Sequence, residues 1–148
     1  MTTLVAMGDS ITVGMGDPAP EGRGWRGFAA LLADTLPQPD LHNLAFLGAQ
    51  AADVERVQLP AALDLKPDVV SLVVGINDTL RGDFDPGRTG AAVGRTVAAL
   101  RESGAHVLTM TLPPWRMASR TSSAGVTRMG PATAAGSRRA CEVTQFWQ

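Results

Sequence analysis

The sequence has few of the features that mark secreted, membrane-spanning or metal-binding proteins. Its single cysteine, Cys141, has no partner for an internal disulfide and forms no metal-ligand spacing. No apolar run approaches the roughly 18 residues of a membrane span, and the N-terminus lacks the basic and apolar regions of a signal peptide. We therefore expect a cytosolic protein with no membrane partner.

Charge is also scarce. A formal net charge of −1 and a pI near 6.1 offer no basic surface for nucleic acid or for an anionic membrane. With 45% hydrophobic and 18% charged residues, a chain of 148 residues is typical of one globular domain. These values favour a small-molecule partner.

Short apolar strands alternate with amphipathic helices over most of the chain. Strands are predicted at residues 4–7, 41–46, 69–74 and 105–112, and helices at 25–34, 51–64 and 86–102. Pro60 should kink or divide the second helix, and Trp25 and Phe28 should belong to the core. The alternation predicts a three-layer α/β fold in which helices flank a parallel sheet of about four strands.

The pattern ends near residue 114. Residues 1–114 hold 8 basic and 13 acidic residues, whereas residues 115–148 hold 5 arginines and only Glu142, and they show no sustained period of a helix or a strand. We interpret 1–114 as the α/β domain and 115–148 as a weakly ordered basic tail. A terminal helix around residues 137–146 is the alternative.

Three residues follow the first three predicted strands: Ser10, Gly48 and Asn77. Because the carboxyl ends of parallel strands lie at one edge of a sheet, we expect these residues to converge there. Acyl transfer from an ester needs a nucleophilic oxygen and several preorganised donors for the developing oxyanion. Ser10 is the candidate nucleophile, and its N–H, the Gly48 N–H and the Asn77 amide are the candidate donors. Gly, Asp and Ser are also common turn formers, so the first motif alone fits an ordinary turn equally well.

Together the motifs resemble those of the SGNH or GDSL hydrolase family, in the family's order. The matching blocks are Gly8-Asp9-Ser10-Ile11, Asn43-Leu44-Ala45-Phe46-Leu47-Gly48-Ala49 and Gly75-Ile76-Asn77-Asp78. The resemblance covers residues 1–114 and implies an SGNH or flavodoxin-like fold. It also implies an esterase, lipase or related acylhydrolase activity without metal or organic cofactor. Asp78 is expected to hold the Asn77 loop through hydrogen bonds to backbone.

One family block has no counterpart. Members carry an Asp-x-x-His block after a fifth strand, which supplies the general base, and this sequence has no Asp after Asp85. His42 lies six residues before Gly48 and His106 six residues before Leu112, so we expect both about 20 Å from the catalytic edge. Asp9 is not expected to act as base, because neighbouring residues near a strand end point apart.

The leading hypothesis is therefore a C-terminally incomplete GDSL-type esterase, through truncation or a change of reading frame, with weak or no activity. Two alternatives are open. The chain could be a pseudoenzyme that binds acyl or carbohydrate esters without hydrolysing them. It could also be an interaction module whose exposed sheet edge accepts a strand and a histidine from another chain.

Overall fold

Four parallel strands form the centre of the molecule in the computed structural model, which describes residues 1–20, 22 and 24–110. The strands are β1 (Thr2–Gly8), β2 (Pro39–Asn43), β3 (Val69–Val73) and β4 (His106–Thr109). Their order in the sheet is β2-β1-β3-β4. The predicted parallel α/β sheet is thus confirmed, while the predicted tail, 115–148, lies outside the described residues.

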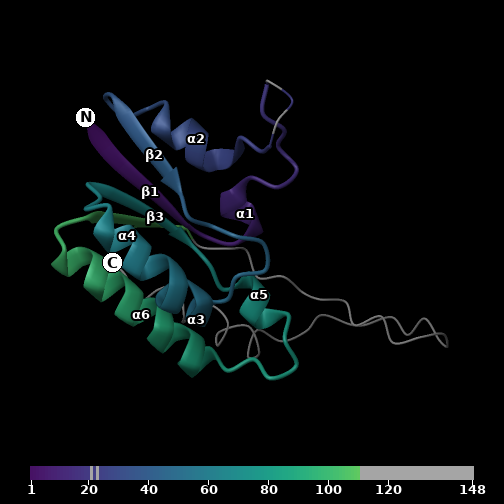
Figure 1. Cartoon of the computed structure of the whole chain (residues 1–148). Coiled ribbons are helices and arrows are strands. Elements are labelled where there is room, and N and C mark those ends of the chain that lie inside the picture. The colour runs from purple at the N-terminus through teal and green to yellow at the C-terminus, as the bar shows by residue number, and fades with distance from the viewer. Residues whose placement is uncertain (21, 23, 111–148) are drawn as a thin grey trace, which may run out of the picture. The chain divides into compact units, whose positions relative to one another are not determined.

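Helices cover both faces of this sheet, with α2 on one side and α4 and α6 on the other (Figure 1). The helical elements are α1 (Ser10–Val13), α2 (Gly27–Ala33), α3 (Ala51–Asp53), the π-helix η1 (Val54–Gln58), α4 (Leu59–Asp64), α5 (Ile76–Thr79) and α6 (Pro86–Glu102). None of those in the described ranges is long and apolar enough to cross a membrane.

The winding direction of the chain reverses at one position in the sheet. From β1 the chain moves to β2 on one side, and β3 then pairs with the opposite side of β1, with Gly8 beside Val73 at their carboxyl ends. In open α/β sheets, ligands bind where the winding direction reverses in this way. The carboxyl ends of β1 and β3 are therefore the expected place for a site.

Residues of β1 and β3 supply the centre of the core. Val5, Met7, Val70 and Leu72 are at most 1% exposed and pack with buried side chains of η1 and α6. Strands covered on both faces favour such continuous apolar runs, which is why the predicted strand 69–74 matches β3 to within one residue and the predicted strand 4–7 lies inside β1.

The expectation that Trp25 belongs to the core is wrong. Its residue is 47% exposed and pairs with Pro18 in an isolated antiparallel bridge, while Arg26 N–H donates to the carbonyl of Asp17. These contacts keep Trp25 in the loop, so α2 begins only at Gly27. Phe28, which is part of the helix, is half-buried.

The second strand lies earlier in the chain than predicted. β2 ends at Asn43, because its Oδ1 accepts a hydrogen bond from Ala45 N–H at 3.1 Å and its Nδ2 donates to the carbonyl of Thr12 at 2.9 Å. Such a local side-chain turn competes with continued strand pairing. The apolar residues 44–46 therefore belong to a loop, which stays beside β1 through a bond from Leu44 N–H to the carbonyl of Ala6.

The helix predicted over 51–64 is divided, as Pro60 suggested. It consists of α3, η1 and α4 in succession, and Leu59 N–H donates to the carbonyl of Val54, five residues earlier. Proline cannot donate a backbone hydrogen bond, and the wider π-turn directly precedes it. This π-helix also carries Gln58, whose side chain forms hydrogen bonds with Gly8 at the end of β1.

Strand β4 forms one edge of the sheet in the described part of the chain, where it pairs only with β3. Leu108 is 46% exposed on this strand. Whether another chain pairs with this edge stays a prediction.

Gly8 is required at the end of β1 for two reasons. Its φ is +145°, and a Cβ added there would lie 2.0 Å from the carbonyl oxygen of Val73. We expect Gly8→Ala to lower the free energy of unfolding by roughly 3 kcal/mol or more, because backbone cannot move aside as a flexible side chain does. Denaturant unfolding monitored by circular dichroism measures this.

The matched control is Gly82→Ala, where an added Cβ meets no atom within 4 Å. It should change the free energy of unfolding by less than about 0.5 kcal/mol. Equal stability of the two variants would contradict the close approach of β1 and β3 at Gly8.

Candidate active site

The three residues singled out by the sequence follow successive strands at the same edge of the sheet. Ser10 begins α1 directly after β1, Gly48 lies in the loop after β2, and Asn77 is the second residue of α5, after β3. Because β1 and β3 are neighbours in a parallel sheet, Ser10 and Asn77 follow adjacent strand ends.

Asp9 determines how the chain leaves β1. It is fully buried and is the N-cap of α1, where its Oδ1 accepts from Ile11 N–H at 3.0 Å. This cap starts a helix of four residues immediately at Ser10, which sequence reasoning treated as a simple turn. Ser10 is half-buried, and neither its hydroxyl nor its N–H has a hydrogen-bond partner among the described residues.

Asn77 connects the other two motifs. Its Nδ2 donates to Oδ2 of Asp9 at 3.2 Å and to the carbonyl oxygen of Ala49 at 3.0 Å. Asp9 adjoins Ser10 and Ala49 adjoins Gly48, so a single amide links the neighbours of both residues. The two bonds occupy both hydrogens of this amide nitrogen.

Gly48 is exposed and has a φ of +76°. A Cβ added at this position would meet nothing within 4 Å, so crowding does not require glycine here. The fold favours glycine because the backbone is in the left-handed region. Its N–H has no acceptor in the described ranges, while the next residue, Ala49, donates to the carbonyl of Phe46. The Gly48 N–H is thus available to a ligand.

Gln58 was missed by sequence reasoning. Its side chain, 1% exposed, accepts from Gly8 N–H at 2.8 Å and donates to the carbonyl of Gly8, also at 2.8 Å. One amide therefore satisfies both backbone groups of the residue at the end of β1. The two residues are 50 positions apart, and no motif in the sequence signals the contact.

Asp78 has the structural role that was expected. Its carboxylate accepts from the N–H of Ala51, at the start of α3, and from the hydroxyl of Thr89 on α6. It thereby joins the Asn77 turn to two helices.

A model of the GDSL-like lipase/acylhydrolase family matches residues 6–145. The chain belongs to this family. The match extends past residue 114, so the likeness is not confined to the part of the chain in which the motifs lie. No curated protein matches the chain.

Solved structures agree with this assignment. The chain is 32% identical to TesA over 76% of its own length and 63% of the TesA chain, with a TM-score of 0.63. An esterase, EstA of Pseudoalteromonas, is 23% identical over 76% and 60% of the two chains with a TM-score of 0.61. A catalytic mutant of Axe2, an acetylxylan esterase from Geobacillus stearothermophilus, is 21% identical over 74% and 59% with a TM-score of 0.60. The last two show the fold alone, and the chain spans less than two thirds of each of the three structures.

The two histidines of this GDSL-like chain differ in position. His106 is the first residue of β4, at the amino end, as expected. His42 is the last but one residue of β2 and pairs with Val5, three residues before Gly8, so its expected distance of about 20 Å is wrong. The rise of a strand places it roughly 10 Å along β1 from Gly8. The error follows from the early end of β2, and the His42 ring interacts with Asp40 at 3.0 Å.

Burial raises the pKa of Asp9 above its ordinary value. The hydrogen bond from Ile11 N–H opposes this rise in pKa, whereas the nearby carboxylate of Asp78 adds to it. Desolvation and a like charge both disfavour the ionised form. Both oxygens of Asp9 already accept hydrogen bonds, so its side chain is a structural part of the turn.

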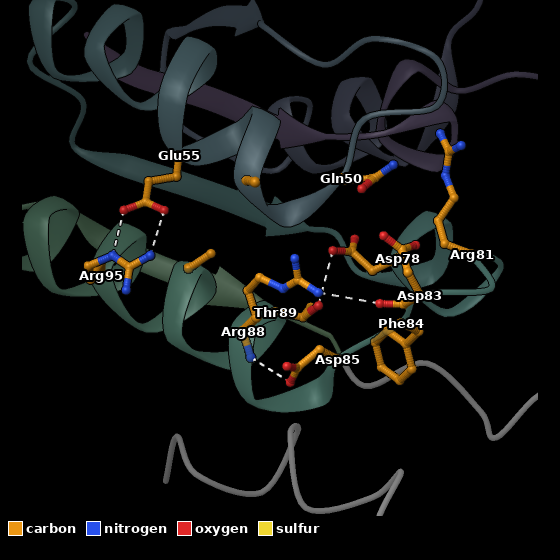
Figure 2. A pocket seen from close by; sticks show the side chains of 12 residues that line it. Gln50, Glu55, Asp78, Arg81, Asp83, Phe84, Asp85, Arg88, Thr89 and Arg95 are labelled. Carbon is orange, nitrogen blue, oxygen red and sulfur yellow. Dashed lines mark hydrogen bonds and ion pairs between the residues drawn. The ribbon is translucent and has the colours of Figure 1, made fainter.

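A cavity of about 310 Å³ lies beside Asp78, between α3, η1, the loop after α5 and α6 (Figure 2). Its arginines have partners within the protein. Arg95 forms a bidentate pair with Glu55, and Arg81 donates to Gln50 once the Gln50 amide is oriented with its oxygen toward Arg81. In the described residues, no three His, Cys, Asp or Glu side chains gather as a metal site.

Replacing Gln58 by leucine should cost roughly 1–3 kcal/mol of unfolding free energy, because the Gly8 N–H loses its partner and the Gly8 carbonyl keeps only the long bond from Phe46 N–H, at 3.4 Å. In Gln58→Glu, the ionised side chain cannot donate to the Gly8 carbonyl, but the protonated one can. This variant should therefore recover stability relative to Gln58→Leu as the pH falls, which denaturant titrations between pH 4 and 8 measure. Val57→Ala, at an adjacent exposed position, is the control. A Gln58→Leu protein as stable as this control would refute the role.

Asp9 should make stability fall with rising pH. Its folded pKa is raised, so between the unfolded and folded pKa values the folded state binds more protons. The free energy of unfolding of Asp9→Asn minus that of the wild type should therefore increase from about pH 4 upward and then level off. The asparagine can also alter contacts with Asn77, which changes stability by an amount that does not depend on pH. The slope of the difference against pH, and not its absolute value, therefore tests the prediction.

Asp85→Asn provides a control of opposite sign. The hydrogen bond from Arg88 N–H lowers the pKa of Asp85 in the folded protein. The ionised Asp85 therefore stabilises the folded state at neutral pH, and this stabilisation is lost as the pH falls through the lowered pKa. The free energy of unfolding of Asp85→Asn minus that of the wild type should therefore decrease as the pH rises. Slopes of equal sign for both variants would contradict the burial of Asp9 as the cause.

Proposed function

We propose that this member of the GDSL-like family carries the nucleophile and oxyanion donors of an ester hydrolase, and that by itself it is at best a very poor catalyst. Ser10 is the nucleophile. The donors are the N–H groups of Ser10 and Gly48 and the side-chain amide of Asn77. The observation that supports this most directly is the pair of hydrogen bonds from Asn77 to Asp9 and Ala49, the neighbours of Ser10 and Gly48.

The chemistry would proceed through an acyl-serine. The Ser10 oxygen attacks the ester carbonyl carbon, and the electron pair of the C=O bond moves to the carbonyl oxygen, where the donors stabilise its charge. Collapse of this intermediate expels the alcohol, and water then hydrolyses the acyl group from Ser10. Asn77 has to exchange one present acceptor for the oxyanion, and the longer bond, 3.2 Å to Asp9, is the one we expect it to release.

Proton removal from Ser10 is the step without a matching residue. The sequence has no Asp-x-x-His block, His106 is at the amino end of β4, and His42 interacts with Asp40. An unactivated serine hydroxyl is a weak nucleophile at neutral pH. Weak or absent activity is therefore part of the proposal.

The second candidate function is binding of esters without turnover. The unpartnered N–H groups of Ser10 and Gly48 in the described residues favour it, because they can hold a carbonyl oxygen without any base. Two of the solved structures are named as acetylxylan esterases, so acetylated carbohydrate is one ligand class to test. A third prediction is that another chain pairs with β4 and donates a strand and a base. The cytosolic location also stays a prediction.

Ester hydrolysis by the purified full chain should be slow and nearly indifferent to Ser10→Ala. Loss of the base costs on the order of 10⁶ in the turnover of a serine hydrolase, whereas binding and oxyanion stabilisation alone retain about 10³–10⁴ over water. Asn77→Ala should reduce the residual rate further than Ser10→Ala does. Hydrolysis of p-nitrophenyl acetate by the three proteins measures this.

A fluorophosphonate probe provides the second readout. Slow, substoichiometric labelling of Ser10 is expected, with none in Ser10→Ala. Rapid turnover abolished by Ser10→Ala, or fast stoichiometric labelling, would show that a base acts on Ser10 and would overturn the assignment of poor catalysis.

A further inference from the structure

A side chain outside the sequence motifs holds the segment that directly follows Gly48. Nε and Nη2 of Arg81 both donate to the side-chain oxygen of Gln50, at 2.9 and 3.0 Å, when the Gln50 amide has its oxygen toward Arg81. The opposite orientation would set amide donors against guanidinium donors. Gln50 lies two residues after Gly48 and is the N-cap of α3, while Arg81 lies four residues after Asn77. This contact therefore connects the segments that carry two of the candidate oxyanion donors.

Gly48 has little restraint of its own. It is exposed, its φ is +76°, and its N–H has no acceptor in the described ranges. The next residue, Ala49, accepts a hydrogen bond from Asn77 at 3.0 Å, but its N–H donates to the carbonyl of Phe46 only at the long distance of 3.4 Å. Glycine has more backbone freedom than any other residue, so the direction of the Gly48 N–H depends on how the residues beside it are held.

Arg81 differs in burial from the other two side chains that reach this segment from α5. Asn77 is half-buried and Asp78 is buried, and each has two or more partners in different segments. Arg81 is exposed. Exposed charged side chains contribute little to global stability, although they can order the segment that they contact. An effect of Arg81 on Gly48 can therefore be separated from an effect on folding.

We propose that Arg81 is a positioning residue for the Gly48 N–H. Through Gln50, its guanidinium fixes the segment after Gly48 against the turn that follows α5, so that this N–H stays directed to the place of the developing oxyanion. The planar fork of an arginine suits this task, because two donors on one acceptor fix the orientation of both side chains. The role of Gly48 as a donor rests on the proposed function, whereas the ordering of Gly48 by Arg81 does not.

The order parameter of the Gly48 N–H, from ¹⁵N relaxation of the full chain, measures this positioning without any reaction. It should be near ~0.85 in the wild type and fall below about 0.6 in Arg81→Ala. Gln50→Ala should lower it equally, and the double variant should be no lower than either single variant, because all three lose the same contact. Gln50→Glu keeps an acceptor for the guanidinium and should retain the wild-type value.

Arg88→Ala is the matched control. Arg88 lines the same cavity from α6, and its guanidinium donates only to the carbonyl of Asp83, at 3.4 Å, among the described residues (Figure 2). This variant removes the same charge and should leave the order of Gly48 unchanged. The Tm of Arg81→Ala should stay within about 3 °C of the wild type. An unchanged Gly48 order parameter in Arg81→Ala, an equal drop in Arg88→Ala, or a larger loss of Tm would overturn the proposal.

The fluorophosphonate probe connects this positioning with the proposed chemistry. The initial rate of Ser10 labelling should be about fivefold or more lower in Arg81→Ala than in the wild type, because the Gly48 N–H no longer stays aligned with the phosphonate oxygen. Arg88→Ala should be labelled at the wild-type rate. Equal rates in Arg81→Ala and the wild type would contradict the role of Arg81. A wild type that is not labelled at all would refute the proposed function, while the order parameters would still decide whether Arg81 positions Gly48.

Discussion

The two hydrogen bonds from the Asn77 amide hold together parts of the chain that have little stability of their own. Asn77 lies in a helix of four residues, Ser10 begins another of four, and Gly48 lies in a loop. Helices this short are not stable in isolation, so their position depends on tertiary contacts. The bonds to Asp9 and Ala49 supply such contacts from α5, which follows β3, to the segments that follow β1 and β2.

This arrangement requires polar groups inside the protein, and their mutual satisfaction limits its energetic cost. Burial raises the pKa of Asp9 and the nearby carboxylate of Asp78 adds to this rise, yet Asp9 accepts hydrogen bonds from Ile11 and Asn77. Gln58 likewise satisfies both backbone groups of Gly8. No buried side-chain nitrogen or oxygen in the described part of the chain lacks a hydrogen-bond partner. Removing one member of such a network leaves another group buried and unpaired, which is why single changes here should be costly.

The sequence predicted the parallel sheet and, to within one residue, the carboxyl ends of β1 and β3, because apolar runs followed by Gly-Asp-Ser and Gly-Ile-Asn-Asp are local signals. It did not predict where β2 ends, since the competing Asn43 turn depends on Thr12, 31 residues away. It placed Trp25 in the core from helical spacing, whereas the bridge to Pro18 holds it in a loop. Gln58 gave no signal, because a buried amide that pairs with a distant backbone has no pattern in the surrounding sequence.

The groups that would hold an ester and the groups that would activate Ser10 come from different segments of the chain. The candidate nucleophile and the candidate oxyanion donors all fall between residues 10 and 77, within the part of the chain built around β1, β2 and β3. In the family resemblance, the base and the acid that orients it follow a later strand. The donors are held by Asn77, Asp9 and Gln58, and none of these contacts involves a residue after Asn77. The geometry that would hold an ester carbonyl therefore forms without the groups that would activate Ser10. In the proposed function, affinity for esters and catalysis are therefore separable, and we expect the affinity where catalysis is weak.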